Sequence, residues 1–318
     1  MTSSNISSNN SKSLEKIAFG GLTKFDSNSI ELRKFQIKDN FRLHSCYYYD
    51  EALNVIKIAS KESKIIPKLT TKVYFNFNTP NGYFTILDQM HRIVDRLSFI
   101  PKDWHIQICV NPSFKEFEKK SFSLFKEKVI KNYGILKYFI ETECLWEKNT
   151  SKIIKSNYID GSCFFMNGIF RSIRDECFLE KSFITYGMLA GGNKYNIRYK
   201  NFYKKYDTYD FKNLIEKNIN FFLRLNRNKK FKYSITSVSS KKNYLDLIGK
   251  IKTLENLYNP KEDKIKINDL TDIFNYRESD SYGVVYDKFY KKYFYNKKRI
   301  VHEIKSSLPL INLSKKWF

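Results

Sequence analysis

Short apolar runs rich in β-branched and aromatic residues alternate with longer amphipathic stretches along most of the chain. Runs of the first kind predict buried strands, and stretches of the second kind predict helices. The predicted strands are Ile17–Gly20, Phe41–Cys46, Leu69–Val73, Trp104–Val110, Ile135–Ile140, Ile159–Phe165, the end of Phe178–Thr185, and Tyr233–Ser237. The predicted helices are Glu51–Ser60, Thr85–Leu97, Lys115–Asn132, Ser151–Ser156, Arg171–Cys177, Phe211–Arg224 and Lys241–Leu257.

Eight strands that alternate with helices within roughly 240 residues match the strand count and length of an α/β protein of the (β/α)8 TIM-barrel class. No G-x-G-x-x-G pattern follows the first strand, which argues against a doubly wound dinucleotide-binding sheet. We predict a disordered Ser/Asn-rich tail over residues 1–13, the barrel over residues 14–258 and a C-terminal extension over residues 259–318. The extension is expected to pack on the barrel or to mediate self-association into a homo-oligomer.

The chain carries a strong positive charge. The 318 residues carry 57 Lys and Arg against 33 Asp and Glu, a net charge of +24, which invites a nucleic-acid hypothesis. However, 46 of the basic residues are Lys and only 11 are Arg, whereas base readout and bidentate phosphate contacts favour Arg. We therefore interpret the charge mainly as a Lys-rich surface, and nucleic-acid binding is the weakest of our hypotheses.

Other features exclude several classes of protein. No apolar run approaches the ~18 residues of a membrane span, and the first residues lack the pattern of a signal peptide. The five cysteines are scattered, so we expect reduced thiols and a cytoplasmic location. No P-loop or G-x-S-x-G motif is present, and the spacing of His105, Cys109 and Cys46 does not predict a metal site. Glu141 and Glu143 lack the facing carboxylate that a glycosidase needs on another strand.

The order of several short motifs resembles the aldo-keto reductase family. Lys16-Ile-Ala-Phe-Gly-Gly21 is similar to its first strand and glycine turn, and Phe41-Arg-Leu-His-Ser-Cys-Tyr-Tyr-Tyr49 to its second strand. Lys68-Leu-Thr-Thr-Lys-Val73 and His105-Ile-Gln-Ile-Cys-Val-Asn-Pro112 resemble the third and fourth strands. Later matches are Phe165-Met-Asn-Gly-Ile-Phe170, Lys181-Ser-Phe-Ile-Thr-Tyr-Gly-Met-Leu-Ala-Gly191 and Ser234-Ile-Thr-Ser-Val-Ser-Ser240. The resemblance spans roughly Ile17 to Leu257.

The resemblance implies reduction of a small-molecule carbonyl substrate with NADP or NAD at the C-terminal mouth of the barrel. In the family a tyrosine gives a proton to the developing alkoxide. Because a free tyrosine has a pKa near 10, the family places a lysine, held by an aspartate, beside it to lower that pKa. The matching positions here are Tyr49 for the tyrosine, Lys72 for the lysine and His44 for the aspartate. Val110 occupies the position of the family's substrate-orienting histidine, so the catalytic tetrad is incomplete.

The same resemblance implies cofactor contacts. The matching positions are Gly21, Asn167, Ser182, Ser239, Ser240 and Lys241. Three positions depart from the family, because Glu141 replaces a serine that holds the carboxamide, Cys163 replaces a glutamine, and Ser237 replaces a glycine. A Lys72 without a carboxylate partner would shift toward the neutral amine in the barrel interior.

These residues leave two principal hypotheses. The first is an aldo-keto reductase-like oxidoreductase in which Tyr49 donates the proton. The alternative is a catalytically degraded barrel, a pseudoenzyme, that serves as a non-redox ligand-binding or assembly protein.

Overall fold

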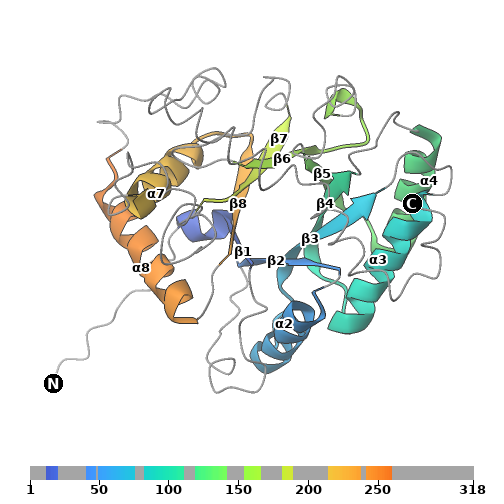
Figure 1. Ribbon diagram of the computed structural model, residues 1–318, viewed down its shortest axis with the longest axis horizontal. Coiled ribbons are helices and arrows are strands. Elements are labelled where there is room, and N and C mark those ends of the chain that lie inside the picture. The colour runs from blue at the N-terminus through green and yellow to red at the C-terminus, as the bar shows by residue number, and fades with distance from the viewer. Residues whose placement is uncertain are drawn as a thin grey trace, which may run out of the picture.

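The computed structural model is a closed barrel in which eight strands follow one another in chain order, each parallel to its neighbours (Figure 1). It describes residues 12–20, 41–47, 49–75, 82–110, 119–141, 154–165, 181–188, 214–237 and 241–259. The strands are β1 (Ile17–Gly20), β2 (Arg42–Cys46), β3 (Lys68–Phe75), β4 (Lys102–Val110), β5 (Lys137–Glu141), β6 (Gly161–Phe165), β7 (Ser182–Tyr186) and β8 (Phe231–Ser237). The predicted (β/α)8 TIM barrel is therefore confirmed.

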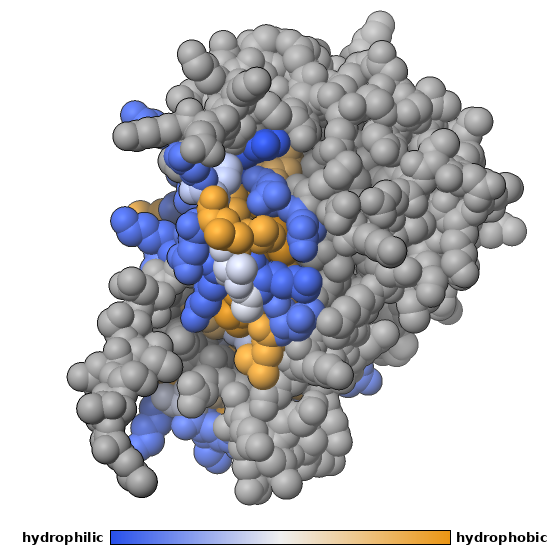
Figure 2. All heavy atoms as spheres, turned by 90° about the vertical axis from the view of Figure 1, so that its left-hand side faces the viewer, coloured by the Kyte–Doolittle hydropathy of each residue, from blue (hydrophilic) through white to orange (hydrophobic). Residues whose placement is uncertain are grey.

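The helices lie around the outside of the barrel (Figure 1). On the face at the left of that view, hydrophilic residues surround a few hydrophobic ones (Figure 2). The helices are α2 (Asp50–Ser63), α3 (Gly82–Leu97), α4 (Lys119–Tyr133), α7 (Leu214–Leu225) and α8 (Lys241–Leu257), with a short 3-10 helix, η1 (Lys12–Lys16), before β1. Their apolar faces cover the strands because each helix carries apolar residues at helical spacing. In α2, for example, Ala52, Val55, Ile56 and Ala59 are buried.

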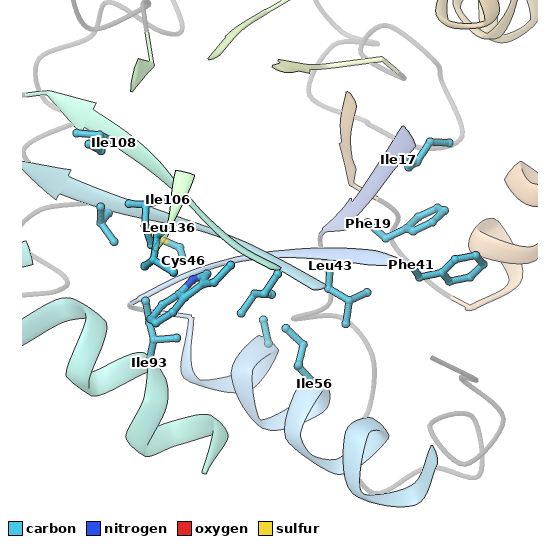
Figure 3. Close-up of a cluster of buried hydrophobic side chains, with 14 of the residues drawn as sticks. Ile17, Phe19, Phe41, Leu43, Cys46, Ile56, Ile93, Ile106, Ile108 and Leu136 are labelled. Carbon is cyan, nitrogen blue, oxygen red and sulfur yellow. The ribbon is translucent and has the colours of Figure 1, made fainter. Parts of the chain in front are cut away.

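The barrel is closed by pairing between its first and last strands, β1 and β8. Ile17 pairs with Ser234 and Gly20 with Ser237 in a parallel ladder. The main hydrophobic core fills the layer between strands and helices, where side chains such as Leu43, Ile56 and Ile106 meet (Figure 3). A smaller apolar cluster occupies the barrel interior and is made of Ala18, Phe139, Cys163, Ile184, Tyr233 and Ile235, with Tyr186 packed against it.

Several boundaries differ from the sequence prediction. The fifth strand begins two residues later than predicted, because Gly134 adopts a left-handed turn with φ of 79° and leaves Ile135 90% exposed. Ser13, assigned to the disordered tail, is buried instead, and its hydroxyl donates to Glu255 at 2.7 Å. The predicted helix Arg171–Cys177 and all but the first residue of the extension over residues 259–318 lie outside the described residues. The proposed division into domains therefore stays a prediction.

Candidate active site

Polar side chains occupy one side of the barrel interior, on strands β2 to β5. Successive residues of a strand point to opposite faces, so His44, Lys72, Gln107 and Glu141 project inward while their neighbours face the helices. Register brings the four strands together, with Cys46 opposite Lys72 and Lys72 opposite Gln107. These four inward side chains, called the mouth network below, lie between the middle of their strands and, for Glu141, the C-terminal end. TIM-barrel enzymes carry their active sites at the C-terminal ends of the strands.

The centre of the mouth network is an ion pair between β3 and β5. Lys72 Nζ lies 3.2 Å from Glu141 Oε1 and 3.0 Å from Oε2, so the ammonium contacts both carboxylate oxygens. The Glu141 side chain is only 5% exposed and that of Lys72 is 22% exposed. The expectation that Lys72 lacks a carboxylate partner is therefore wrong. Glu141, assigned by resemblance to a cofactor-contacting position, supplies the negative charge that His44 cannot.

Gln107 connects this ion pair to His44. Its Nε2 group donates to Glu141 Oε2 at 2.8 Å, which fixes the orientation of the amide and leaves Oε1 as an acceptor. Since that Oε1 lies 2.9 Å from His44 Nε2, the imidazole must carry its proton on Nε2 and donate it to Gln107. The three hydrogen-bonded partners thus determine the tautomer of His44.

His44 is neutral at pH 7. Burial lowers its pKa to about 4, and the nearby positive charge of Lys72 acts in the same direction. The hydrogen bond to Gln107 and the charge of Glu141 oppose the shift without overcoming it. His44 therefore cannot act as the anionic partner of Lys72, and its place in the mouth network is that of a neutral hydrogen-bond donor.

Tyr49 lies in the turn between β2 and α2, beyond the C-terminal end of β2. Its backbone N–H donates to the carbonyl of Cys46 at 3.0 Å, and its side chain is 41% exposed. The neighbouring Tyr47 N–H donates to the carbonyl of Lys72 at 3.4 Å, and the Cys46 thiol donates to the same carbonyl at 3.2 Å. The turn that carries Tyr49 is therefore bound to the backbone of Lys72.

The remaining cofactor-contacting positions inferred from the sequence have mixed outcomes. Ser182 is the first residue of β7 and pairs with Gly161, the first residue of β6, so it lies at the N-terminal end of the barrel. That position does not fit a contact with a cofactor at the C-terminal mouth. Lys241 begins α8 directly after the loop that follows β8. Gly21, Asn167, Ser239 and Ser240 lie outside the described residues.

Sequence reasoning missed a second polar cluster, which closes the N-terminal end of the barrel. Arg42 forms an ion pair with Asp103, and its guanidinium stacks 4.8 Å above the ring centre of Tyr233. His105 contacts Asp103 Oδ1 through Nε2 at 3.2 Å and the Tyr233 hydroxyl through Nδ1 at 2.8 Å. The same hydroxyl lies 2.7 Å from Thr70 Oγ1. The alternation of Arg42 and His44 along an otherwise apolar strand was the signal that could have revealed a polar interior.

The hydrogen bonds of this second cluster engage the whole imidazole of His105. Both ring nitrogens of His105 already have hydrogen-bond partners, and burial lowers its pKa to about 4. Among the described residues, no group of three or more His, Cys, Asp or Glu side chains could hold a metal ion. Cys46 and Cys163 are buried and form no disulfide with any described residue. No helix of the described part of the chain is long and apolar enough to cross a membrane.

Comparisons with known proteins bear on the fold. No protein-family model matches the chain, and no curated protein matches its sequence. Among solved structures, an aldo-keto reductase from a Medee basin deep-sea metagenome library is 12% identical, with a TM-score of 0.50 over 82% of this chain and 90% of the other. An aldo-keto reductase from Klebsiella pneumoniae, in complex with NADP and acetate, is 11% identical, with a TM-score of 0.48 over 78% and 93%.

A third similar structure is an aldo-keto reductase from Bacillus halodurans, in its apo form. It is 13% identical, with a TM-score of 0.48 over 76% of this chain and 84% of the other. At such identities the likeness concerns the fold alone. The chain has a barrel of the kind found in aldo-keto reductases, which agrees with the order of motifs in its sequence.

Proposed function

We propose that the protein is an aldo-keto reductase-like oxidoreductase that reduces a small-molecule carbonyl with NADPH or NADH. The observation that carries the proposal is the ion pair between Lys72 and the buried Glu141, together with the hydrogen bond that joins the Lys72 carbonyl to the Tyr47 N–H in the turn before Tyr49. A lysine fixed in its charged form at the mouth of a barrel is the group that an acid–base tyrosine requires. Glu141 thus takes the part of the family's aspartate, whose position in this sequence is occupied by His44.

In this proposal the hydroxyl of Tyr49 donates the proton to the carbonyl oxygen as negative charge develops there. The Lys72 ammonium stabilises the tyrosinate left behind, since opposite charges at short range favour the ionised phenol. Glu141 keeps the ammonium charged and oriented, and Gln107 holds Glu141 in turn. His44, neutral and fixed as its Nε2–H tautomer, donates to Gln107 and so helps to orient it without adding charge to the site.

The described residues fit a nicotinamide dinucleotide in two respects. The N-terminus of α8 opens at Lys241, just beyond the C-terminal end of β8, and helix N-termini bind phosphates through their unsatisfied N–H groups. The Glu141 carboxylate, at the C-terminal end of β5, is a hydrogen-bond acceptor of the kind that a carboxamide N–H requires. When bound, the reduced nicotinamide supplies the hydride. Ser239, Ser240 and Lys241 remain the proposed phosphate contacts, and Gly21 and Asn167 remain proposed contacts of the mouth.

Val110, the last residue of β4, sets an upper limit on the rate. A valine side chain cannot donate a hydrogen bond to the carbonyl oxygen, and loss of one such preorganised donor costs about 3–4 kcal/mol, or 10²–10³ in rate. We therefore expect slow turnover with simple aldehydes. We also expect the reaction to occur in the cytoplasm, where thiols such as those of Cys46 and Cys163 stay reduced.

The test combines cofactor binding with turnover. NADPH and NADH are titrated into the purified protein by fluorescence, and oxidation of NADPH is followed with a panel of small aldehydes. Tyr49→Phe should bind cofactor as the wild type does but lose turnover, because only the hydroxyl is removed. Tyr133→Phe, a change of the same kind on α4, serves as the matched control. Absence of cofactor binding at high micromolar concentrations would reject the proposal.

A second candidate function is a non-redox ligand-binding or assembly protein. It is favoured by Val110 and Cys163, which stand where the reductase pattern has polar groups, and by the neutral state of His44. Under this hypothesis the mouth network binds a polar ligand without chemistry, and residues 259–318 mediate self-association. Tight NADPH binding with turnover that Tyr49→Phe abolishes would refute it.

A further inference from the structure

The residue that follows Tyr49 is tied to a neighbouring helix. Asp50 begins α2, and its carboxylate receives two hydrogen bonds from Arg92 of α3. The distances from Arg92 Nη2 are 3.0 Å to Oδ1 and 2.8 Å to Oδ2. Such charge-assisted contacts restrict orientation as well as position. The beginning of α2, and with it the turn after β2, is therefore anchored on α3.

The backbone of Tyr49 itself is restrained by two hydrogen bonds. Its N–H donates to Cys46 and its carbonyl accepts from Leu53, both at 3.0 Å. Tyr49 is the N-cap residue of α2, with φ of −95° and ψ of 72° and no side-chain capping bond. Because a helix start without a capping side chain frays readily, the contact between Arg92 and Asp50 adds a side-chain anchor to the two backbone hydrogen bonds at this end of α2.

Arg96, one helical turn further along α3, provides an internal comparison. Its Nε lies 3.5 Å from Asp50 Oδ1, and its side chain is 54% exposed. The Arg92 side chain is only 19% exposed and makes the two shorter contacts. A solvent-exposed ion pair at such a distance contributes little. The two arginines thus share a helix, a partner and a charge but differ in the quality of the contact.

We propose that Arg92 is a positioning residue for Tyr49, acting through Asp50 to hold the tyrosine where it meets the carbonyl oxygen. The inference rests on the proposed reductase function, since it assigns Tyr49 the role of proton donor. It names a further residue of the reaction, on an element that none of the matched motifs includes. A bridge that merely joins α2 to α3 would stabilise the protein equally but would not affect the placement of Tyr49.

The experiment compares Arg92→Ala, Arg92→Lys and Arg96→Ala in the full chain. Misplacing a catalytic group by about 1 Å can cost about 10²-fold in rate, so Arg92→Ala should lower kcat by at least about tenfold while KM for NADPH stays within about twofold. Arg92→Lys keeps the charge without the fork of donors and should restore part of kcat. Arg96→Ala should change kcat by less than about twofold, in line with its weaker contact.

A second readout does not depend on activity. 3-Fluorotyrosine is placed at position 49, and its ¹⁹F resonance is compared among the variants, with the same label at Tyr258, which follows α8, as control. Arg92→Ala should shift or broaden the resonance at position 49 and leave that at 258 unchanged. Arg96→Ala should alter neither.

The two readouts separate the failure of each proposal. If the wild type does not turn over NADPH, the reductase function fails, and a ¹⁹F change confined to Arg92→Ala still supports positioning of Tyr49. If the wild type is active but Arg92→Ala retains full kcat, or leaves the ¹⁹F resonance unchanged, the positioning role is overturned. A lowered melting temperature without either effect identifies a structural bridge and likewise overturns it.

Discussion

Replacing Glu141 with glutamine removes the negative charge from the mouth network while preserving the size of the side chain. At 3.0 Å and an effective dielectric constant of about 20, the attraction between Lys72 and Glu141 is about 5–6 kcal/mol. The loss of this attraction is partly compensated, because the neutral glutamine avoids the cost of desolvating a buried carboxylate. Water also partly solvates the remaining Lys72 ammonium, whose side chain is 22% exposed. We expect Glu141→Gln to lower the free energy of unfolding by about 2–3 kcal/mol.

A double-mutant cycle isolates the pair. Lys72→Met leaves the Glu141 carboxylate buried without the opposite charge of the ammonium, which should cost about 3–5 kcal/mol. The variant that carries both changes has no uncompensated charge, so its loss of stability should be at least about 2 kcal/mol smaller than the sum of the two single losses. The remaining cost reflects the changed packing of the barrel interior.

Urea unfolding followed by tryptophan fluorescence measures all four proteins, and Trp104, buried on β4, reports on this part of the barrel. The coupling energy between the two changes should be nearly independent of salt, since a buried pair is screened far less than an exposed one. Additivity of the two single changes within about 0.5 kcal/mol would refute the ion pair as the organising contact of the site.

Three further predictions concern pH, packing and a helix. His44 and His105, with pKa lowered to about 4, should be neutral in the folded protein, whereas unfolded histidine has a pKa of about 6.5. The unfolded chain therefore binds more protons between these values, and stability should fall as pH drops from about 6.5 to 4, by up to about 3 kcal/mol per histidine; ring-proton NMR titrations with midpoints near 6.5 would disagree. Gly161→Ala should cost about 3 kcal/mol or more in urea unfolding, because the added Cβ would lie 1.9 Å from the Ser182 carbonyl oxygen of β7. Gly249→Ala on α8, where nothing lies within 4 Å, should instead be neutral or stabilise by up to about 1 kcal/mol, and similar effects of the two changes would contradict the strand contact.

The sequence was informative where burial alone decides structure. Apolar runs placed all eight strands, and for Ile17–Gly20 and Lys241–Leu257 the predicted bounds coincide with β1 and α8. The exact ends of the strands and helices were harder to predict, because they depend on the geometry of the adjoining turns. Gly134 is the clearest case, since its left-handed conformation excludes Ile135 from β5 despite a favourable side chain.

The site was harder to predict because its contacts join strands that are distant in the sequence. Lys72 and His44 could be assigned from short motifs, but the partner of Lys72 lies 69 residues away and depends on the register of β3, β4 and β5. No local pattern distinguishes Glu141 from an exposed carboxylate at a strand end. The Arg42–Asp103 pair was missed for the same reason, because charged residues at the start of a strand normally face solvent.

The most direct test of the account is single-turnover oxidation of NADPH by an aldehyde in wild-type protein and in Tyr49→Phe. We predict hydride transfer in the wild type and a loss of at least about 10²-fold in Tyr49→Phe with unchanged cofactor affinity, since general acid catalysis contributes 10²–10⁴-fold. Equal rates in the two proteins would contradict the assignment of Tyr49 as the acid, and no oxidation in the wild type would contradict the proposed function.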